Sequence, residues 1–133
     1  VAHEYLGREV AGKDVIIVDD MISSGDSVID VAKQLKDKGA KRIFIFATFG
    51  LFCNGLENID KAYEEGNIDK IFTTNLIYQT PELLSREWYC SVNMSKYIAL
   101  LVDTLNNDNS ISKLLDPADK IKAAVAKYDA ERK

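Results

Sequence analysis

The sequence predicts an α/β protein with a three-layer, mostly parallel sheet flanked by helices, and an extra helix at its C-terminal end. Two observations predict this class. Continuous apolar, β-branched runs such as residues 15–18 are typical of strands buried on both faces of a parallel sheet. Stretches with apolar residues at helical spacing alternate with these runs, which is the pattern of successive right-handed βαβ units.

The first βαβ unit is the best defined. Its strand over 15–18 is followed by a polar loop, and Val28, Val31, Ala32 and Leu35 then form one face of a helix. Gly39 ends that helix. The remaining predicted elements are a strand over 43–48, a helix marked by residues 56–63, a strand over 70–74, a capped turn over 80–84, a strand over 88–92, a helix over 94–105 and a tail helix from Asp116 to about Arg132.

Length and composition indicate a single domain. The chain has 133 residues, 47% hydrophobic residues and a net charge of −4. We expect residues 1–116 to form the domain and residues 117–133 a helical extension of it, which packs on the domain or on a neighbouring subunit. Without a basic block the chain is not expected to bind nucleic acid, and no apolar run reaches the roughly 20 residues that span a membrane. We expect a cytoplasmic protein, and its start at Val1 suggests a piece of a longer chain.

The two cysteines do not form a metal-binding pattern. Cys53 and Cys90 are far apart in the sequence, and the one histidine, His3, lies at the N-terminal end. We therefore expect two buried thiols in a reducing compartment.

An acidic pair follows the first strand. Ligands of open α/β sheets bind at the carboxyl ends of the strands, where Asp19 and Asp20 are expected. Adjacent carboxylates point in different directions, so at least one can reach the vicinal hydroxyls of a sugar or a Mg²⁺ ion. We predict Asp19 and Asp20 as ribose-binding residues and as candidate metal ligands.

The loop after the acidic pair suits a phosphate. Unpaired N–H groups at the start of the next helix attract an anion, and Gly25 allows close approach of the backbone. Carboxylates for a diol beside amides for a phosphate describe a pentose 5-phosphate. The predicted phosphate-binding residues are Ser23, Ser24, Gly25, Asp26 and Ser27. Asp26 is compatible with a phosphate only if its side chain turns away and its amide does the binding.

This segment has two other interpretations. Ser24 or Asp26 could simply cap a helix, and the acids could decorate the surface. The receiver domain of bacterial signalling proteins also has an acidic pair after a buried strand, but it needs a further acid at the end of a later strand. Here Phe49 and Gly50 follow the strand over 43–48, so the phospho-acceptor is missing.

The segment from Val15 to Ser27 resembles the phosphoribosyl-diphosphate-binding signature of type I phosphoribosyltransferase-fold proteins. Residues 45–55 are similar to the second block of ribose-phosphate diphosphokinase, residues 74–77 to its later strand-to-loop segment, and residues 109–115 to the stretch that closes many of these enzymes. The resemblance covers roughly residues 3–116 and is to the C-terminal half of that family.

The resemblance implies a function. These enzymes transfer the β,γ-diphosphoryl group of Mg·ATP to the C1 hydroxyl of ribose 5-phosphate, giving AMP and phosphoribosyl diphosphate. It also implies Mg²⁺ as cofactor, a dimer-based homo-oligomer, possible hexamers, and an ATP site upstream of this chain. We therefore expect no turnover by the chain alone, and no catalytic residue is assigned within it. The sequence departs from the family at Phe49, which replaces a histidine, at Asn54, which replaces a serine, and in the phosphate loop.

Two alternative functions were considered. One is a phosphoribosyltransferase that consumes phosphoribosyl diphosphate, against which the Phe49–Gly50 block argues. The other is a non-catalytic regulatory relative of the synthetase, which would have no reason to retain both the acidic pair and the loop.

Overall fold

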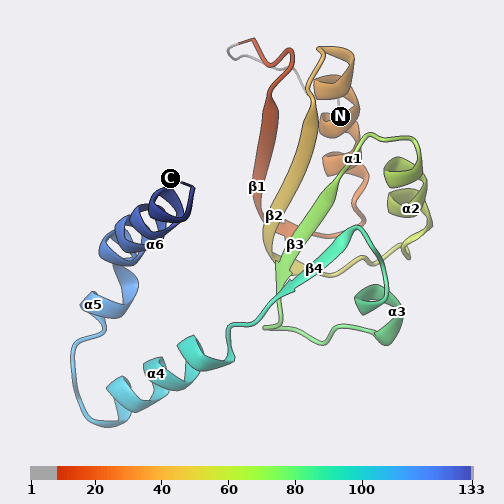
Figure 1. Cartoon of the computed structure of the whole chain (residues 1–133). Helices are drawn as coiled ribbons and strands as arrows, with labels where there is room; N and C mark the ends of the chain where they lie inside the picture. Colours follow the sequence, from red (N-terminus) through yellow and green to blue (C-terminus); the bar gives the residue numbers. More distant parts are fainter. Residues whose placement is uncertain (1–8, 133) are drawn as a thin grey trace. The chain divides into compact units, whose positions relative to one another are not determined.

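The computed structural model describes residues 9–132, apart from the side chain of Lys113 (Figure 1). His3, Val1 and the remainder of the first eight residues lie outside the described part. The chain divides into two compact units, Val1–Met94 and Ser95–Lys133. This division falls earlier than the predicted boundary at residue 116.

The first unit is built on one parallel sheet, and the predicted α/β class is confirmed. Its strands are β1 (Asp14–Ile22), β2 (Arg42–Gly50), β3 (Lys70–Thr74) and β4 (Tyr89–Val92), and they neighbour one another in that order. All three strand pairs are parallel. Strand β1 extends beyond the predicted run to Ile22, so the acidic pair belongs to the strand and does not follow it.

The strand order determines where the helices lie. Each right-handed crossover from a strand to its next neighbour places its helix on the same face when the order never reverses. Helices α1 (Asp26–Asp37), α2 (Glu57–Glu64) and α3 (Pro81–Leu84) accordingly lie on one side of the sheet (Figure 1). The core forms between them and the sheet, and its most buried large side chains include Ile43, Ile45, Ile59, Ile71 and Trp88.

The opposite face of the sheet is apolar but open, which corrects the expectation of strands buried on both faces. Ile16 is 62% exposed and Val18 is 78% exposed. Phe46 and Phe72 stack on each other on this face, with ring centroids 4.4 Å apart. Within residues 9–94 the molecule therefore has two layers, because sequential strand order sends all three helices to one side.

The start of the β1–β2 pair is fixed by an ion pair. Asp14 and Arg42 are partners in the strand register, and the Arg42 Nε donates to Asp14 Oδ1 at 2.9 Å. Hydrogen bonds from Arg42 lower the pKa of the Asp14 carboxyl and raise the pKa of the guanidinium. Because both groups are at the surface, their main effect is to select this register.

The second unit is helical. It contains α4 (Ser95–Asn106), α5 (Ser112–Leu115) and α6 (Ala118–Glu131). The Tyr97 hydroxyl donates to the Leu114 carbonyl at 2.9 Å and so ties α4 to α5. Asp116, at which we expect the tail helix to begin, lies just before α6, and its Oδ1 accepts from the Ala118 N–H at 3.0 Å. None of the described helices is long and apolar enough to cross a bilayer.

One substitution on the buried face of the sheet and one on the open face together test whether only one face is packed. Ile45→Ala should lower the free energy of unfolding by about 2–5 kcal/mol, because it leaves a cavity in the buried face. Val18→Ala, on the adjacent strand but the open face, should change it by less than about 0.5 kcal/mol. Urea unfolding of both variants measures this. Equal losses would mean that the second face is packed in solution, contrary to the structure.

Candidate functional site

Only one of the two predicted acids faces the loop. Neighbouring residues of a strand point to opposite sides, and Asp19 is half-buried whereas Asp20 is exposed. Asp19 lines a cavity of about 120 Å³ that it shares with the loop. Its Oδ1 accepts a hydrogen bond from the Asp20 N–H at 2.8 Å.

The loop residues form the rest of this cavity, which we call the loop cavity. Ser23, Ser24, Gly25 and Ser27 line it, together with Met21, Ile22 and Val28. Asp20 and Asp26 are not part of the lining. The structure therefore brings together Asp19 and four of the five predicted phosphate-loop residues, and it leaves the side chains of Asp20 and Asp26 outside.

Gly25 creates the turn into α1. It is the N-cap residue and has a φ of 93°. The first N–H groups of an α-helix have no partner within the helix, and the helix dipole makes this end partly positive. Among the residues that the structure describes, the lining of the loop cavity contains no lysine or arginine. An anion bound here would be held by backbone N–H groups and serine hydroxyls rather than by cationic side chains.

Close packing against α2 is a second reason why residue 25 must be a glycine. A Cβ at this position would lie 3.0 Å from Cδ1 of Ile59, a core residue of α2. The loop is thus pressed against α2, and its backbone comes close to the helix layer only because residue 25 lacks a side chain.

The segment after β2 supports the loop from the other side. The Leu51 N–H donates to the Ile22 carbonyl at 2.8 Å, and the Cys53 N–H donates to the Ser23 carbonyl at 2.9 Å. The Ser23 hydroxyl is 3.9 Å from the Cys53 sulfur, to which it donates. These contacts continue the β1–β2 pairing into the loop, a role of Cys53 that no sequence pattern indicated.

The cysteines correct a prediction. Cys53 is exposed and Cys90 is only half-buried, so the expectation of two buried thiols is wrong. The chain turns sharply at Phe52, whose φ is 49°, and it is the ring of Phe52 that enters the core, leaving Cys53 on the surface.

A polar network fixes the segment that follows β3. The Tyr89 hydroxyl is 2.6 Å from Thr73 Oγ1, and it also accepts from the Gln79 amide. Burial raises the pKa of the Tyr89 hydroxyl, and its hydrogen bonds with Thr73 and Gln79 oppose that shift. The network anchors Gln79, and with it the loop between β3 and α3, to Thr73 near the carboxyl end of β3 and to Tyr89, the first residue of β4.

One of the two acids is placed to hold a magnesium ion at the loop cavity. Mg²⁺ is usually held by one or two carboxylates together with waters and substrate phosphates. Asp19 offers such a carboxylate in the cavity lining, whereas Asp20 points to the opposite side of the strand. Within the described residues no group of three or more histidine, cysteine or acidic side chains is placed to bind a metal. A metal here would therefore depend on substrate oxygens for the rest of its ligands.

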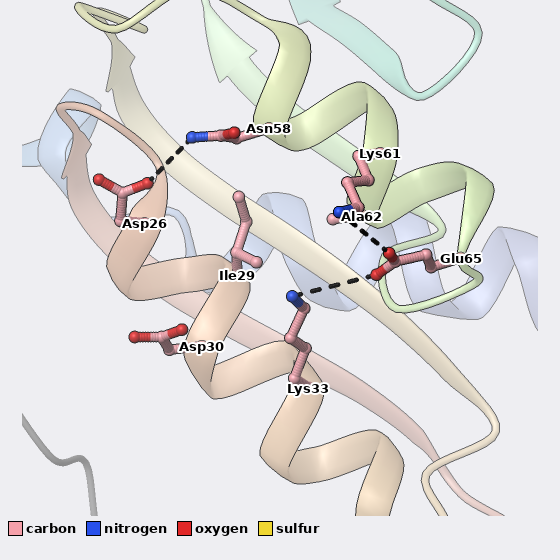
Figure 2. A pocket seen from close by; sticks show the side chains of 8 residues that line it. All are labelled: Asp26, Ile29, Asp30, Lys33, Asn58, Lys61, Ala62 and Glu65. Atoms are coloured by element: carbon pink, nitrogen blue, oxygen red, sulfur yellow. Dashed lines mark hydrogen bonds and ion pairs between the residues drawn. The ribbon is translucent and has the colours of Figure 1, made fainter.

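A larger groove of about 220 Å³ lies elsewhere, between α1 and α2 (Figure 2). Its basic side chains are already engaged, because Lys33 and Lys61 pair with Glu65 at 4.0 Å and 3.8 Å. Asp26 reaches this groove, where its Oδ1 accepts from the Asn58 amide at 3.4 Å. Although it is larger, the groove is not the better candidate for an anion site, because both of its lysines already pair with Glu65.

Comparisons with known proteins show the family of the chain. The chain belongs to the family of the phosphoribosyl synthetase-associated domain, whose model matches residues 5–116. It is 35% identical over 107 residues to the ribose-phosphate pyrophosphokinase of Shewanella oneidensis, a match that covers 80% of this chain and 33% of that protein. The enzyme of the same name from Mycoplasma pneumoniae is 47% identical over 74 residues, covering 54% of this chain and 22% of that protein.

A solved structure shows the same fold. The phosphoribosylpyrophosphate synthetase from Mycobacterium smegmatis superposes with a TM-score of 0.67 at 21% identity, covering 77% of this chain and 33% of that chain. The chain thus spans about a third of the length of the curated relatives it matches at greatest coverage. The similarity to ribose-phosphate pyrophosphokinases is consistent with the resemblance recognised from residues 15–27.

Two glycines allow a controlled test of the loop geometry. Gly25→Ala should lower the free energy of unfolding by about 1–2 kcal/mol, because an alanine must adopt a left-handed conformation there. It should lower it by a further ~1–3 kcal/mol because the new Cβ crowds Ile59. Gly12 also has a positive φ, 72°, but a Cβ there meets nothing within 4 Å. Gly12→Ala should therefore show only the first cost in thermal or urea unfolding. If the two variants lose the same stability, the close packing of the loop on α2 is incorrect.

Proposed function

We propose that this chain is the ribose-5-phosphate-binding part of a ribose-phosphate pyrophosphokinase and that it corresponds to the C-terminal half of that enzyme. The observation that carries the proposal is the loop cavity, where a strand-borne carboxylate meets the open N-terminus of α1. Membership of the family supports it. In this proposal the complete enzyme is a cytoplasmic homo-oligomer that uses ATP as its substrate and Mg²⁺ as its cofactor.

The phosphate would bind at the loop. The backbone N–H groups at the start of α1 are suited to an anion, and the missing side chain of Gly25 lets the phosphate oxygens approach them. The Ser27 hydroxyl is exposed and can add a donor, and the exposed Ser23 hydroxyl can do so by leaving its 3.9 Å contact with the Cys53 sulfur. Because these donors are uncharged, binding depends on their orientation more than on attraction from a distance.

The ribose would bind at the acids. Asp19 lies in the same cavity as the loop, so its carboxylate can accept from a vicinal hydroxyl of a sugar whose 5-phosphate occupies the loop. Asp19 is also the better placed of the two acids to hold Mg²⁺ or a water bound to it, because Asp20 points to the opposite side of the strand. When present, the metal would neutralise charge on the diphosphate.

The chemistry requires little of this chain beyond positioning. The C1 hydroxyl oxygen attacks the β-phosphorus of ATP, the bond from that phosphorus to the oxygen of the α-phosphate breaks, and AMP leaves as the C1 hydroxyl loses its proton. Charge neutralisation and alignment supply most of the rate in such a transfer. Here Asp19 and the loop would hold the acceptor sugar while another part of the enzyme presents ATP.

Ribose 5-phosphate titration of the ¹⁵N-labelled chain tests the binding assignment. Millimolar ribose 5-phosphate should shift the amide signals of residues 23–27, and Asp19→Asn should weaken the affinity about 10-fold or more, because it removes a charged acceptor. Asp37→Asn, which removes an acid at the far end of α1, is the matched control and should bind like the wild type. Shifts that avoid the loop, or an Asp19→Asn variant with unchanged affinity, would refute the assignment.

The absence of turnover is a separate prediction. The loop cavity has no cationic side chain in its lining, whereas a bound triphosphate needs several cations and a metal. The chain alone, given Mg·ATP and ribose 5-phosphate, should therefore form no AMP above the rate without protein. Measurable AMP formation would show that the chain carries an ATP site of its own.

A further inference from the structure

Asp26 is the least expected residue of the loop, since a carboxylate beside a phosphate is repulsive. The structure turns this side chain away from the loop cavity and toward α2 (Figure 2). There its two oxygens are separately engaged. Oδ2 accepts from the Ser24 hydroxyl at 2.8 Å, and Oδ1 accepts from the Asn58 amide at the longer distance of 3.4 Å.

The hydrogen bond from Ser24 to Asp26, here called the latch, defines what Ser24 can do. A serine hydroxyl has a single proton, and the latch uses it. The Ser24 oxygen also accepts from the Asp26 N–H at 3.3 Å, so the two residues close a small ring on each other. In this arrangement Ser24 has no hydroxyl proton left for an anion, although it lines the loop cavity.

The position of Asp26 stabilises the latch. Asp26 is the first residue of α1, where the helix dipole favours a negative charge. The latch joins it to the loop, and Asn58 joins it to α2. The carboxylate therefore connects the loop to α2. It is not part of the lining of the loop cavity.

We propose that Asp26 is a positioning residue for phosphate binding: its carboxylate holds the Ser24 hydroxyl out of the loop cavity and ties the loop to α2 through Asn58. The phosphate is then held by backbone N–H groups and by the Ser27 hydroxyl, with Ser24 acting only through its place in the loop. This proposal rests on the proposed function for its ligand, but the latch itself is a property of the free chain.

A set of variants tests the latch by its effect on affinity. Asp26→Ala and Ser24→Ala should each weaken ribose 5-phosphate binding by about 2- to 10-fold, the range of one hydrogen bond. The double variant should be no weaker than either single one, because both remove the same hydrogen bond. Asp26→Asn keeps an oxygen that accepts from Ser24 and should bind within about 2-fold of the wild type.

Asp30→Asn is the matched control for charge. Asp30 lines the same groove one turn further along α1, and it takes no part in the latch. The Asp30→Asn variant should bind ribose 5-phosphate as tightly as the wild type. Asn58→Ala should lose less affinity for ribose 5-phosphate than Asp26→Ala. Additive losses in the double variant would show that Ser24 contacts the phosphate itself, and an Asp26→Ala variant that binds as well as the wild type would show that the latch has no role. Either result overturns the proposal.

Amide hydrogen exchange separates this proposal from the proposed function. In the free chain, the amides of Gly25 and Ser27 should exchange faster in Asp26→Ala than in Asp30→Asn, with unchanged exchange in the core strands. If no variant binds ribose 5-phosphate, wild type included, the proposed function fails. Faster exchange in Asp26→Ala would still establish the latch, and unchanged exchange would exclude it.

Discussion

The structure depends above all on the parallel pairing of β1 with β2 in a single register. That register begins at the Asp14–Arg42 pair and ends with Ile22 opposite Gly50. Because both strands run the same way, the loop before α1 and the segment after β2 leave the sheet at one edge, where Leu51 and Cys53 continue the hydrogen bonding. A shift of one residue would exchange the two faces of β1 and remove Asp19 from the loop cavity.

Sequential strand order explains both the site and the open face. It places every crossover helix on one side, so that α1 starts at the carboxyl edge next to Asp19 and α2 backs the loop through Ile59. The same order leaves Ile16, Val18 and the Phe46–Phe72 pair without helices from the first unit over them. The site is therefore assembled by two neighbouring βαβ units and needs little from the rest of the sheet.

Local patterns predicted the first βαβ unit and the loop well. The apolar run at 15–18, the helical spacing from Val28 to Leu35 and the stop at Gly39 depend on near neighbours, and all are present. The open sheet face was not predictable, because strand order is a long-range property that an apolar run does not report. The exposure of Cys53 depends on the left-handed turn at Phe52, and the direction of Asp26 depends on Asn58, 32 positions away.

The central claim is that uncharged donors at the start of α1 hold the phosphate of a pentose whose hydroxyls reach Asp19. A crystal structure of the chain grown with ribose 5-phosphate tests it most directly. We expect phosphate density within hydrogen-bonding distance of the N–H groups of residues 25, 27 and 28, with the ribose directed toward Asp19. Phosphate density in the groove between α1 and α2, on Lys33 and Lys61 with the loop cavity empty, would contradict it.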